Sequence, residues 1–154
     1  MRRLVKGLMT KERGFSLVEV LVGLSILAIV AAGFLMAIAT AYKANIISNE
    51  RTNADSLART QMESIKAADY ELATAGGQEV YLKIPVPDGW EIWSVRIVDN
   101  EEVIDEDAIL IIAIPWDSQN GIPTPTDAGL QKIKLVIVHN GNEVLWLEEY
   151  KEDR

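Results

Sequence analysis

The stretch Gly14-Phe15-Ser16-Leu17-Val18-Glu19-Val20-Leu21-Val22 opens the longest apolar run of the chain, and this run decides the fold. The run continues to Tyr42, and Glu19 is the only charged residue among its 28 residues. A helix of that length is about 42 Å long, which exceeds the roughly 30 Å of a bilayer's hydrocarbon core. The sequence therefore predicts a membrane-spanning helix over residues 15–42. The run is longer than the apolar part of a secretory signal peptide, so we expect it to stay in the finished protein.

Charge is distributed unevenly on the two sides of this run. Residues 1–14 have a net charge of +4, whereas residues 15–154 carry −12. A basic flank before an apolar span predicts a cytoplasmic N-terminus, with the remainder of the chain outside the cytoplasm. The acidic remainder repels phosphate backbones, which makes nucleic acid an unlikely partner. The chain has no cysteine, which excludes disulfides, thiolate zinc sites and a cysteine nucleophile.

Glu19 is costly inside such a span, because an ionised side chain in hydrocarbon costs roughly 3 kcal/mol or more. One interpretation is that the carboxylate reaches the interface or is protonated. The other is that it pairs with a positive charge from another chain. A cut after Gly14 would create a new amine on Phe15, four residues before Glu19, and that amine could meet its own Glu19 or a neighbour's.

The nine residues quoted above resemble the prepilin-type cleavage and methylation motif of type IV pilins and type II secretion pseudopilins. The shared features are a short basic leader, Gly, then Phe, then Glu as the fifth residue of the processed chain, and a long apolar helix. The resemblance implies cleavage between Gly14 and Phe15 by a prepilin peptidase, and N-methylation of Phe15. It also implies that Glu19 neutralises the Phe15 amine of a neighbouring subunit during assembly.

The same resemblance implies the partners and the location of the chain. The partners are the prepilin peptidase, other pilin or pseudopilin subunits that pack through the N-terminal helix, and an assembly platform in the inner membrane. The chain would start as a single-pass inner-membrane protein and end in a cell-surface filament or a periplasmic pseudopilus. Close packing of helices is favoured by small residues, and Gly23, Gly33, Ala37 and Ala44 lie near one stripe, although such residues are common in any membrane helix.

Residues 43–70 predict an amphipathic continuation of the helix. Apolar residues, among them Ala54, Met62 and Ile65, recur at spacings of three, four and seven, and no Pro or Gly interrupts residues 45–72. The stretch Ala54–Tyr70 resembles minor pilins likened to pilus modification protein V and to the I-type minor pseudopilin. This second resemblance implies a minor rather than a major subunit.

Residues 71–154 predict a β-rich domain outside the cytoplasm. After Gly76-Gly77 the pattern favours strands, and His139-Asn140-Gly141-Asn142 predicts a tight hairpin turn. We expect four or five antiparallel strands that pack on the second half of the helix, an α+β fold. The expected strands are 79–84, 90–98, 108–114, 130–138 and 143–150, with a long loop over 115–129.

Other candidate sites in this domain are weak. The acidic residues between Asp99 and Asp107 and the stretch Asp117–Gly121 offer oxygen ligands for calcium, with Asp105, Asp107, Asp117 and Asn120 as candidates. Neither stretch has an ordered ligand spacing, so solvated loops are the preferred interpretation. We expect Trp93 and Trp146 in the core. Trp116 could be an exposed contact residue, but packing in the core or in its loop is the preferred interpretation.

No cofactor motif and no catalytic constellation is visible in the sequence. His139 is the only histidine, and we expect it to be solvated in its turn. The sequence therefore predicts a structural subunit rather than an enzyme. The alternatives are a single-pass membrane protein with an extracytoplasmic binding domain and an accidental motif, and a membrane-anchored enzyme.

Overall fold

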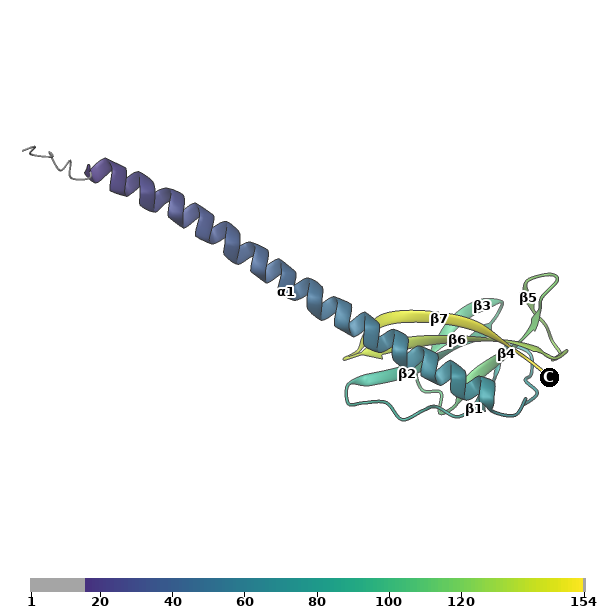
Figure 1. Ribbon diagram of the computed structural model, residues 1–154. Helices are drawn as coiled ribbons and strands as arrows, with labels where there is room; N and C mark the ends of the chain where they lie inside the picture. Colours follow the sequence, from purple (N-terminus) through teal and green to yellow (C-terminus); the bar gives the residue numbers. More distant parts are fainter. Residues whose placement is uncertain (1–15, 154) are drawn as a thin grey trace, which may run out of the picture. The chain divides into compact units, whose positions relative to one another are not determined.

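A computed structural model describes residues 16–153 of the chain (Figure 1). The chain divides into two compact units, Met1–Ala44 and Asn45–Arg154, which are described separately below. One helix, α1 (Leu17–Ala67), contributes to both units.

The described part of the first unit is the apolar portion of α1. This helix contains an 18-residue window with a mean hydropathy of 2.6, none of it buried, and it is long and apolar enough to cross a membrane. The Ser25 and Thr40 hydroxyls donate hydrogen bonds to the carbonyls of Leu21 and Met36, at 2.8 and 2.9 Å. Both polar side chains are thereby satisfied within the helix itself, which lowers their cost in hydrocarbon.

The second unit contains the end of α1 and seven antiparallel strands. The strands are β1 (Gln78–Tyr81), β2 (Trp90–Val98), β3 (Glu101–Asp105), β4 (Ile111–Asp117), β5 (Ile122–Pro123), β6 (Leu130–His139) and β7 (Asn142–Glu152). Their order in the sheet is β1-β4-β6-β2-β3, with β7 paired to β6 and β5 paired to β4. The predicted α+β fold is confirmed.

The sheet is curled, and β2 lies between β6 and β3 in it. Residues 90–94 of β2 pair with β6, whereas residues 94–98 pair with β3. Two hairpin turns use residues with positive φ. The predicted Asn140-Gly141 turn joins β6 to β7, and Asp99-Asn100, with φ of 51° and 68°, joins β2 to β3.

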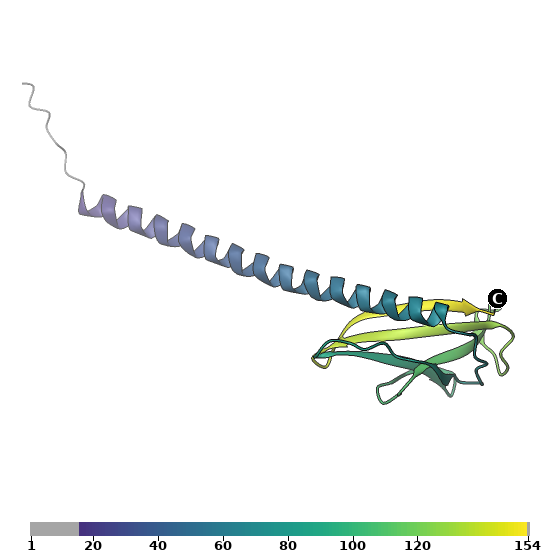
Figure 2. The same ribbon diagram turned by 60° about the horizontal axis from the view of Figure 1, so that its bottom comes forward.

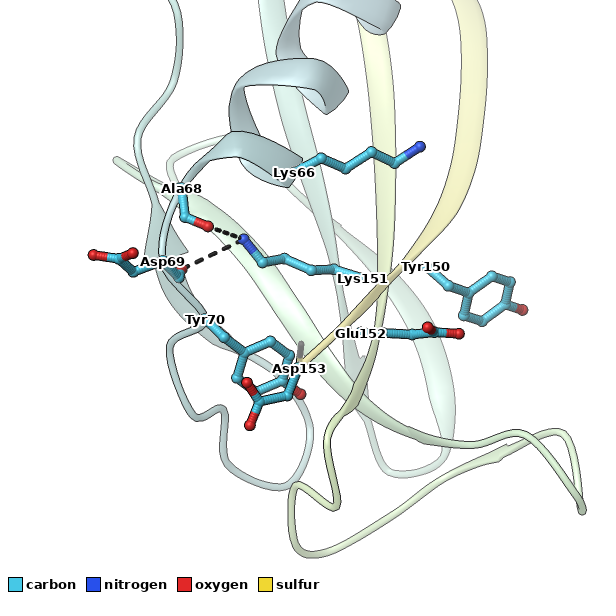
Figure 3. A pocket seen from close by; sticks show the side chains of 8 residues that line it. All are labelled: Lys66, Ala68, Asp69, Tyr70, Tyr150, Lys151, Glu152 and Asp153. Atoms are coloured by element: carbon cyan, nitrogen blue, oxygen red, sulfur yellow. Dashed lines mark hydrogen bonds between the residues drawn. The ribbon is translucent and has the colours of Figure 1, made fainter.

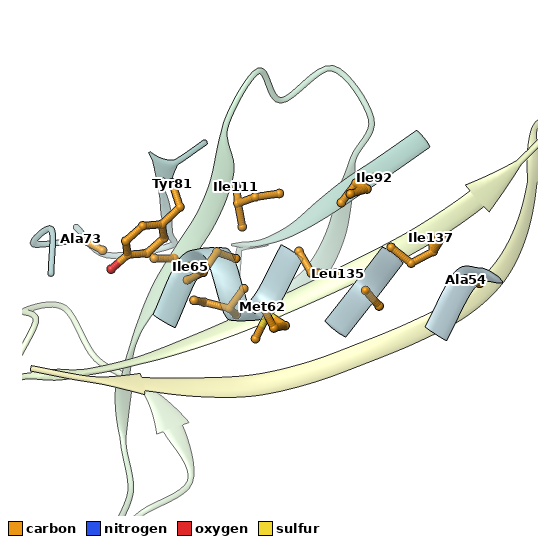
Figure 4. Close-up of a cluster of buried hydrophobic side chains, with 12 residues drawn as sticks. Ala54, Met62, Ile65, Ala73, Tyr81, Ile92, Ile111, Leu135 and Ile137 are labelled. Carbon is orange, nitrogen blue, oxygen red and sulfur yellow. The ribbon is translucent and has the colours of Figure 1, made fainter. Parts of the chain in front are cut away.

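The main core lies between the second half of α1 and one face of the sheet. Figure 2 shows this part of the helix lying along the β6–β7 side of the sheet, and Figure 4 shows the buried side chains. Ala54 and Ala58 bring the helix close to the sheet, while Met62 and Ile65 fill the space further along. The side chains that meet them from the sheet include Ile111, Ile133, Leu135 and Ile137.

The other face of the sheet is also largely covered. Val95, Val136 and Val138 form a second buried cluster with Trp93 and Ile104, and Ala108, Ile112 and Ile114 form a third with Ile97 and Trp116. The continuous apolar run 108–114 is one of the expected strands. Residues 111–114 are buried in β4, although the strand begins at Ile111 and extends through Pro115 to Asp117.

Several sequence-based expectations about individual residues were wrong. Part of the acidic stretch 99–107 is a strand, β3, and not a solvated loop. Trp146 is 43% exposed and does not fill the core. Trp116 lies on β4 and is partly buried against the third cluster, which agrees with the expectation that it is packed and not an exposed contact residue. Trp93 is partly buried, in the second cluster. Gln61, a polar residue of the amphipathic stretch 43–70, is fully buried.

Candidate functional site

Glu19 lies in the first turn of α1, at the beginning of the apolar helix. Ser16 precedes the helix, and its carbonyl accepts the hydrogen bond of the Val20 amide at 3.1 Å. Ser16 and Glu19 thus have the spacing of a capping box, and a carboxylate in this turn interacts favourably with the positive end of the helix dipole. Glu19 is exposed, and no hydrogen bond or ion pair of its carboxylate is recorded within residues 16–153. Its position therefore has a local electrostatic reason and still leaves the carboxylate accessible to another chain.

The predicted cleavage and methylation residues, Gly14 and Phe15, lie outside the described residues. From Val20 to Asn49 every residue of the helix is exposed, and a Cβ added at Gly23 or Gly33 would meet no atom within 4 Å. Both glycines lie on open helix surface.

Three polar groups that the sequence did not identify, of which Gln61 and Lys151 are buried and Asp127 is half-buried, connect α1 and the segments around it to the rest of the second unit. The first is Gln61, whose amide nitrogen donates to the Leu82 carbonyl at 2.9 Å and whose oxygen accepts from the Ile84 amide at 2.7 Å. Two backbone groups of the segment after β1 thereby find their hydrogen-bond partners in a side chain of the helix. No sequence signal distinguishes Gln61 from its exposed polar neighbours.

The second group is Asp127, which joins the segment after α1 to the segment before β6. Its carboxylate accepts hydrogen bonds from the Tyr70 hydroxyl, the Ala73 and Gly129 amides and the Gln131 side chain. Burial alone would raise the pKa of Asp127, but these four donors outweigh it and hold the pKa below its ordinary value. The Asp-Ala-Gly sequence is a turn signal that could have indicated this residue.

The third group is Lys151 on β7, which binds the C-terminal end of α1 (Figure 3). Its ammonium donates to the carbonyls of Ile65, Ala68 and Asp69, and it lies 4.6 Å from the centre of the Tyr81 ring. Burial lowers its pKa, and Asp69 partly opposes this effect. The cation satisfies carbonyls that a helix end leaves without partners and complements the negative end of the dipole.

A polar cavity of about 560 Å³ opens beside Lys151 and is lined by residues from the end of α1 and the end of β7.

The alternation of β7 could have predicted the inward direction of Lys151. Leu145 and Leu147 lie an even number of residues before it, so they share its face of the strand, and both pack against the core.

His139 is not a solvated turn residue, contrary to the expectation. It ends β6, its ring stacks on Trp90 with the ring centres 4.3 Å apart, and its Nδ1 lies 3.2 Å from the Glu50 carboxylate on α1. The ring is fixed on two sides, and 23% of the side chain remains exposed. No nucleophile or second histidine accompanies it within residues 16–153.

The calcium candidates are engaged in other contacts or isolated. Asp105 pairs with Arg96, and the Asp117 carboxylate accepts hydrogen bonds from the Gln119 amide and from Asn120, which hold the pKa of Asp117 below its usual range. Asp107 is exposed. Across the described part of the chain, no three His, Cys, Asp or Glu side chains are grouped so that they could hold a metal ion.

Comparison with known proteins identifies the N-terminal segment. The sequence model of a family described as the prokaryotic N-terminal methylation motif matches residues 9–35. This match covers the end of the basic flank, the Gly14-Phe15 bond, Glu19 and more than half of the apolar run, and it supports the type IV pilin and pseudopilin family. Neither the curated proteins nor the solved structures gave a significant match.

Proposed function

We propose that this chain, whose N-terminal segment carries the methylation motif of type IV pilins and pseudopilins, is a non-enzymatic subunit of a filament. It is cut after Gly14 by a prepilin peptidase, methylated on Phe15 and assembled through its apolar helix into a type IV pilus or a type II secretion pseudopilus. The single observation that carries this proposal is the motif match over residues 9–35.

The geometry of the first helical turn supports the role of Glu19 in this scheme. The carboxylate is exposed at the start of a helix whose first half is apolar and exposed throughout. Cleavage would add one positive charge close to this carboxylate in every subunit. A neighbour's amine can then pair with it, which offsets part of the cost of burying both charges in an apolar filament core.

We further propose that the chain is a minor subunit, present at the start or the tip of the filament. The support is the likeness of Ala54–Tyr70 to minor pilins, together with the absence of a cysteine pair. The residues of this stretch also have structural tasks, because Met62 and Ile65 are buried in the core and Tyr70 binds Asp127.

Intact mass of the chain, isolated from cells with and without an active prepilin peptidase, tests the proposal. We expect the active host to yield a chain that lacks residues 1–14 and carries about one added methyl group. Gly14→Ala should abolish the cut. Glu19→Ala should be cut like the wild type but should be absent from sheared filaments.

A full-length mass in the active host would contradict the proposal. The chain would then be a membrane-anchored binding domain or enzyme with an accidental motif. Gly23→Ala is the matched control for Gly14→Ala, because it makes the same change on open helix surface and should leave the cleavage intact.

A further inference from the structure

A polar pocket lies in the second unit where the β6–β7 turn approaches α1. Its volume is about 320 Å³. Besides two apolar side chains, its walls are formed by Glu50 and Arg51 of α1 and by His139, Asn140, Asn142 and Glu143 of the turn and the adjoining strand ends. The pocket is separate from the Lys151 cavity and from the Glu19 region, so the proposed function does not use it.

The pocket presents both signs of charge in a fixed arrangement. Stacking on Trp90 and the contact with Glu50 hold the His139 ring, and Asn142 donates to the Asn140 carbonyl at 3.2 Å, which fixes the turn. Arg51 is exposed, and its side chain forms no hydrogen bond or ion pair within residues 16–153. The wall thus has one available guanidinium, side-chain amides that can donate, and two carboxylates. One oxygen of Glu50 faces His139 and one oxygen of Glu143 accepts from the Trp146 indole at 3.0 Å, which leaves the second oxygen of each carboxylate for a ligand.

These groups are complementary to a ligand that carries a phosphate and, close to it, a primary ammonium group. A guanidinium donates two hydrogen bonds to phosphate oxygens in a bidentate contact, and side-chain amides add further donors. The carboxylates of Glu50 and Glu143 can accept hydrogen bonds from a primary ammonium group. A ligand with a phosphate alone would leave these carboxylates facing an anion.

The place of the pocket in the sequence indicates where such a ligand comes from. Ile47, which also lines the pocket, follows the last residue of the apolar run, Tyr42, by only five residues. Polar residues that directly follow a membrane span meet the headgroup layer of the bilayer. This inference about the source of the ligand rests on the membrane-spanning helix of the proposed function, but it requires neither cleavage nor filament assembly.

We propose that this pocket binds the phosphoethanolamine headgroup of a membrane lipid. Arg51 and the turn amides hold the phosphate, and Glu50 and Glu143 hold the ammonium.

Native mass spectrometry of the full chain, released from micelles with equal amounts of phosphatidylethanolamine, phosphatidylcholine and phosphatidylglycerol, tests this site. We expect phosphatidylethanolamine to be retained preferentially, because the choline group cannot donate hydrogen bonds and the glycerol group carries no cation. Arg51→Gln and Glu143→Gln should each lower this retention roughly tenfold, the loss expected for one charged hydrogen bond.

Arg59→Gln is the matched control. Arg59 lies on the same helix and is also exposed, but it pairs with Asp55 and does not line the pocket. The Arg59→Gln variant should retain as much lipid as the wild type. Equal retention of phosphatidylglycerol, or unchanged retention by Arg51→Gln, would overturn the proposal.

A further arm distinguishes the lipid from a soluble ligand with the same chemistry. Free phosphoethanolamine, added at the concentration of the lipid, should fail to displace it, because the lipid is held in the same micelle as the chain. Full displacement at that concentration would overturn the assignment to a membrane lipid. The lipid assay gives the same readout on cleaved and uncleaved chains, so its failure is distinguishable from failure of the proposed processing.

Discussion

At the scale of single residues, Asp127 shows why a carboxylate is needed where the sequence suggests only a turn. All four groups that contact its two oxygens are donors, and an ionised carboxylate can accept all four. An asparagine of the same size has one acceptor oxygen, and its NH₂ group would face two donors.

We therefore expect Asp127→Asn to lower the free energy of unfolding by about 2–4 kcal/mol, the cost of leaving two partly buried donors without acceptors. The measurement is urea unfolding of the full chain in detergent micelles. Fluorescence is a selective probe here, because all four tryptophans lie in the second unit. Asp88→Asn is the control, since Asp88 is exposed before β2 and should be neutral within about 0.5 kcal/mol.

The lowered pKa of Asp127 also predicts a pH dependence. Its folded pKa lies below the unfolded value near 3.9, so its contribution is present above that value and is lost as the pH falls through the folded pKa. The stability difference between wild type and Asp127→Asn should therefore shrink at the acid end. A difference that stays constant down to pH 2 would show that charge at this position is irrelevant.

At the scale of elements, the end of α1 depends on a residue that is 82 to 86 positions further along the chain. Lys151 satisfies the last helical carbonyls from β7, so the helix end is capped by the sheet and not by a local motif. A glycine C-cap, the usual stop signal, is absent here; the first glycine after the helix is Gly76.

Lys151→Met should therefore cost about 2 kcal/mol of stability and should increase amide hydrogen exchange in the last turn of α1. Methionine keeps the length and the apolar stem but removes the ammonium. Lys66→Met is the control, because Lys66 is an exposed lysine at the same helix end that pairs only with Glu149, and its loss should cost below about 1 kcal/mol. Exchange that rises equally in both variants would contradict a specific role of Lys151.

The observed elements differ in how well the sequence predicted them. The long helix was predictable because its apolar run contains no Pro and passes into an amphipathic stretch with neither Gly nor Pro, and the β6–β7 hairpin because Asn-Gly supplies both positive φ angles. The strand β3 was missed because its acidic composition hid the alternation, and because Asp99-Asn100 is a weaker turn signal. The partners of Gln61 and Lys151, and two of the four partners of Asp127, lie at least 21 positions away in the sequence, so no local pattern reveals these contacts.

At the scale of the whole molecule, the sign of charge changes across the apolar run. Residues 1–14 are basic and the remainder is strongly acidic. The orientation of the chain in the membrane could therefore be set by the basic flank alone or by the difference in net charge between the two sides. The rule for membrane insertion counts Lys and Arg near the ends of a span, whereas Asp and Glu contribute little. The basic flank, and not the difference in net charge, should therefore set the orientation.

This distinction predicts different results for two triple variants that change the charge difference equally. Replacing Arg2, Arg3 and Lys6 by Gln should leave a substantial fraction of chains with the second unit inside the cell. Replacing Glu101, Glu106 and Asp107 by Gln, all of them exposed in the second unit, should leave the orientation unchanged. The measurement is digestion of the second unit by protease added to intact spheroplasts, with a lysed sample as the full-digestion reference. Equal protection in both variants would mean that net charge orients the chain, and full digestion in both would mean that the apolar run alone does so.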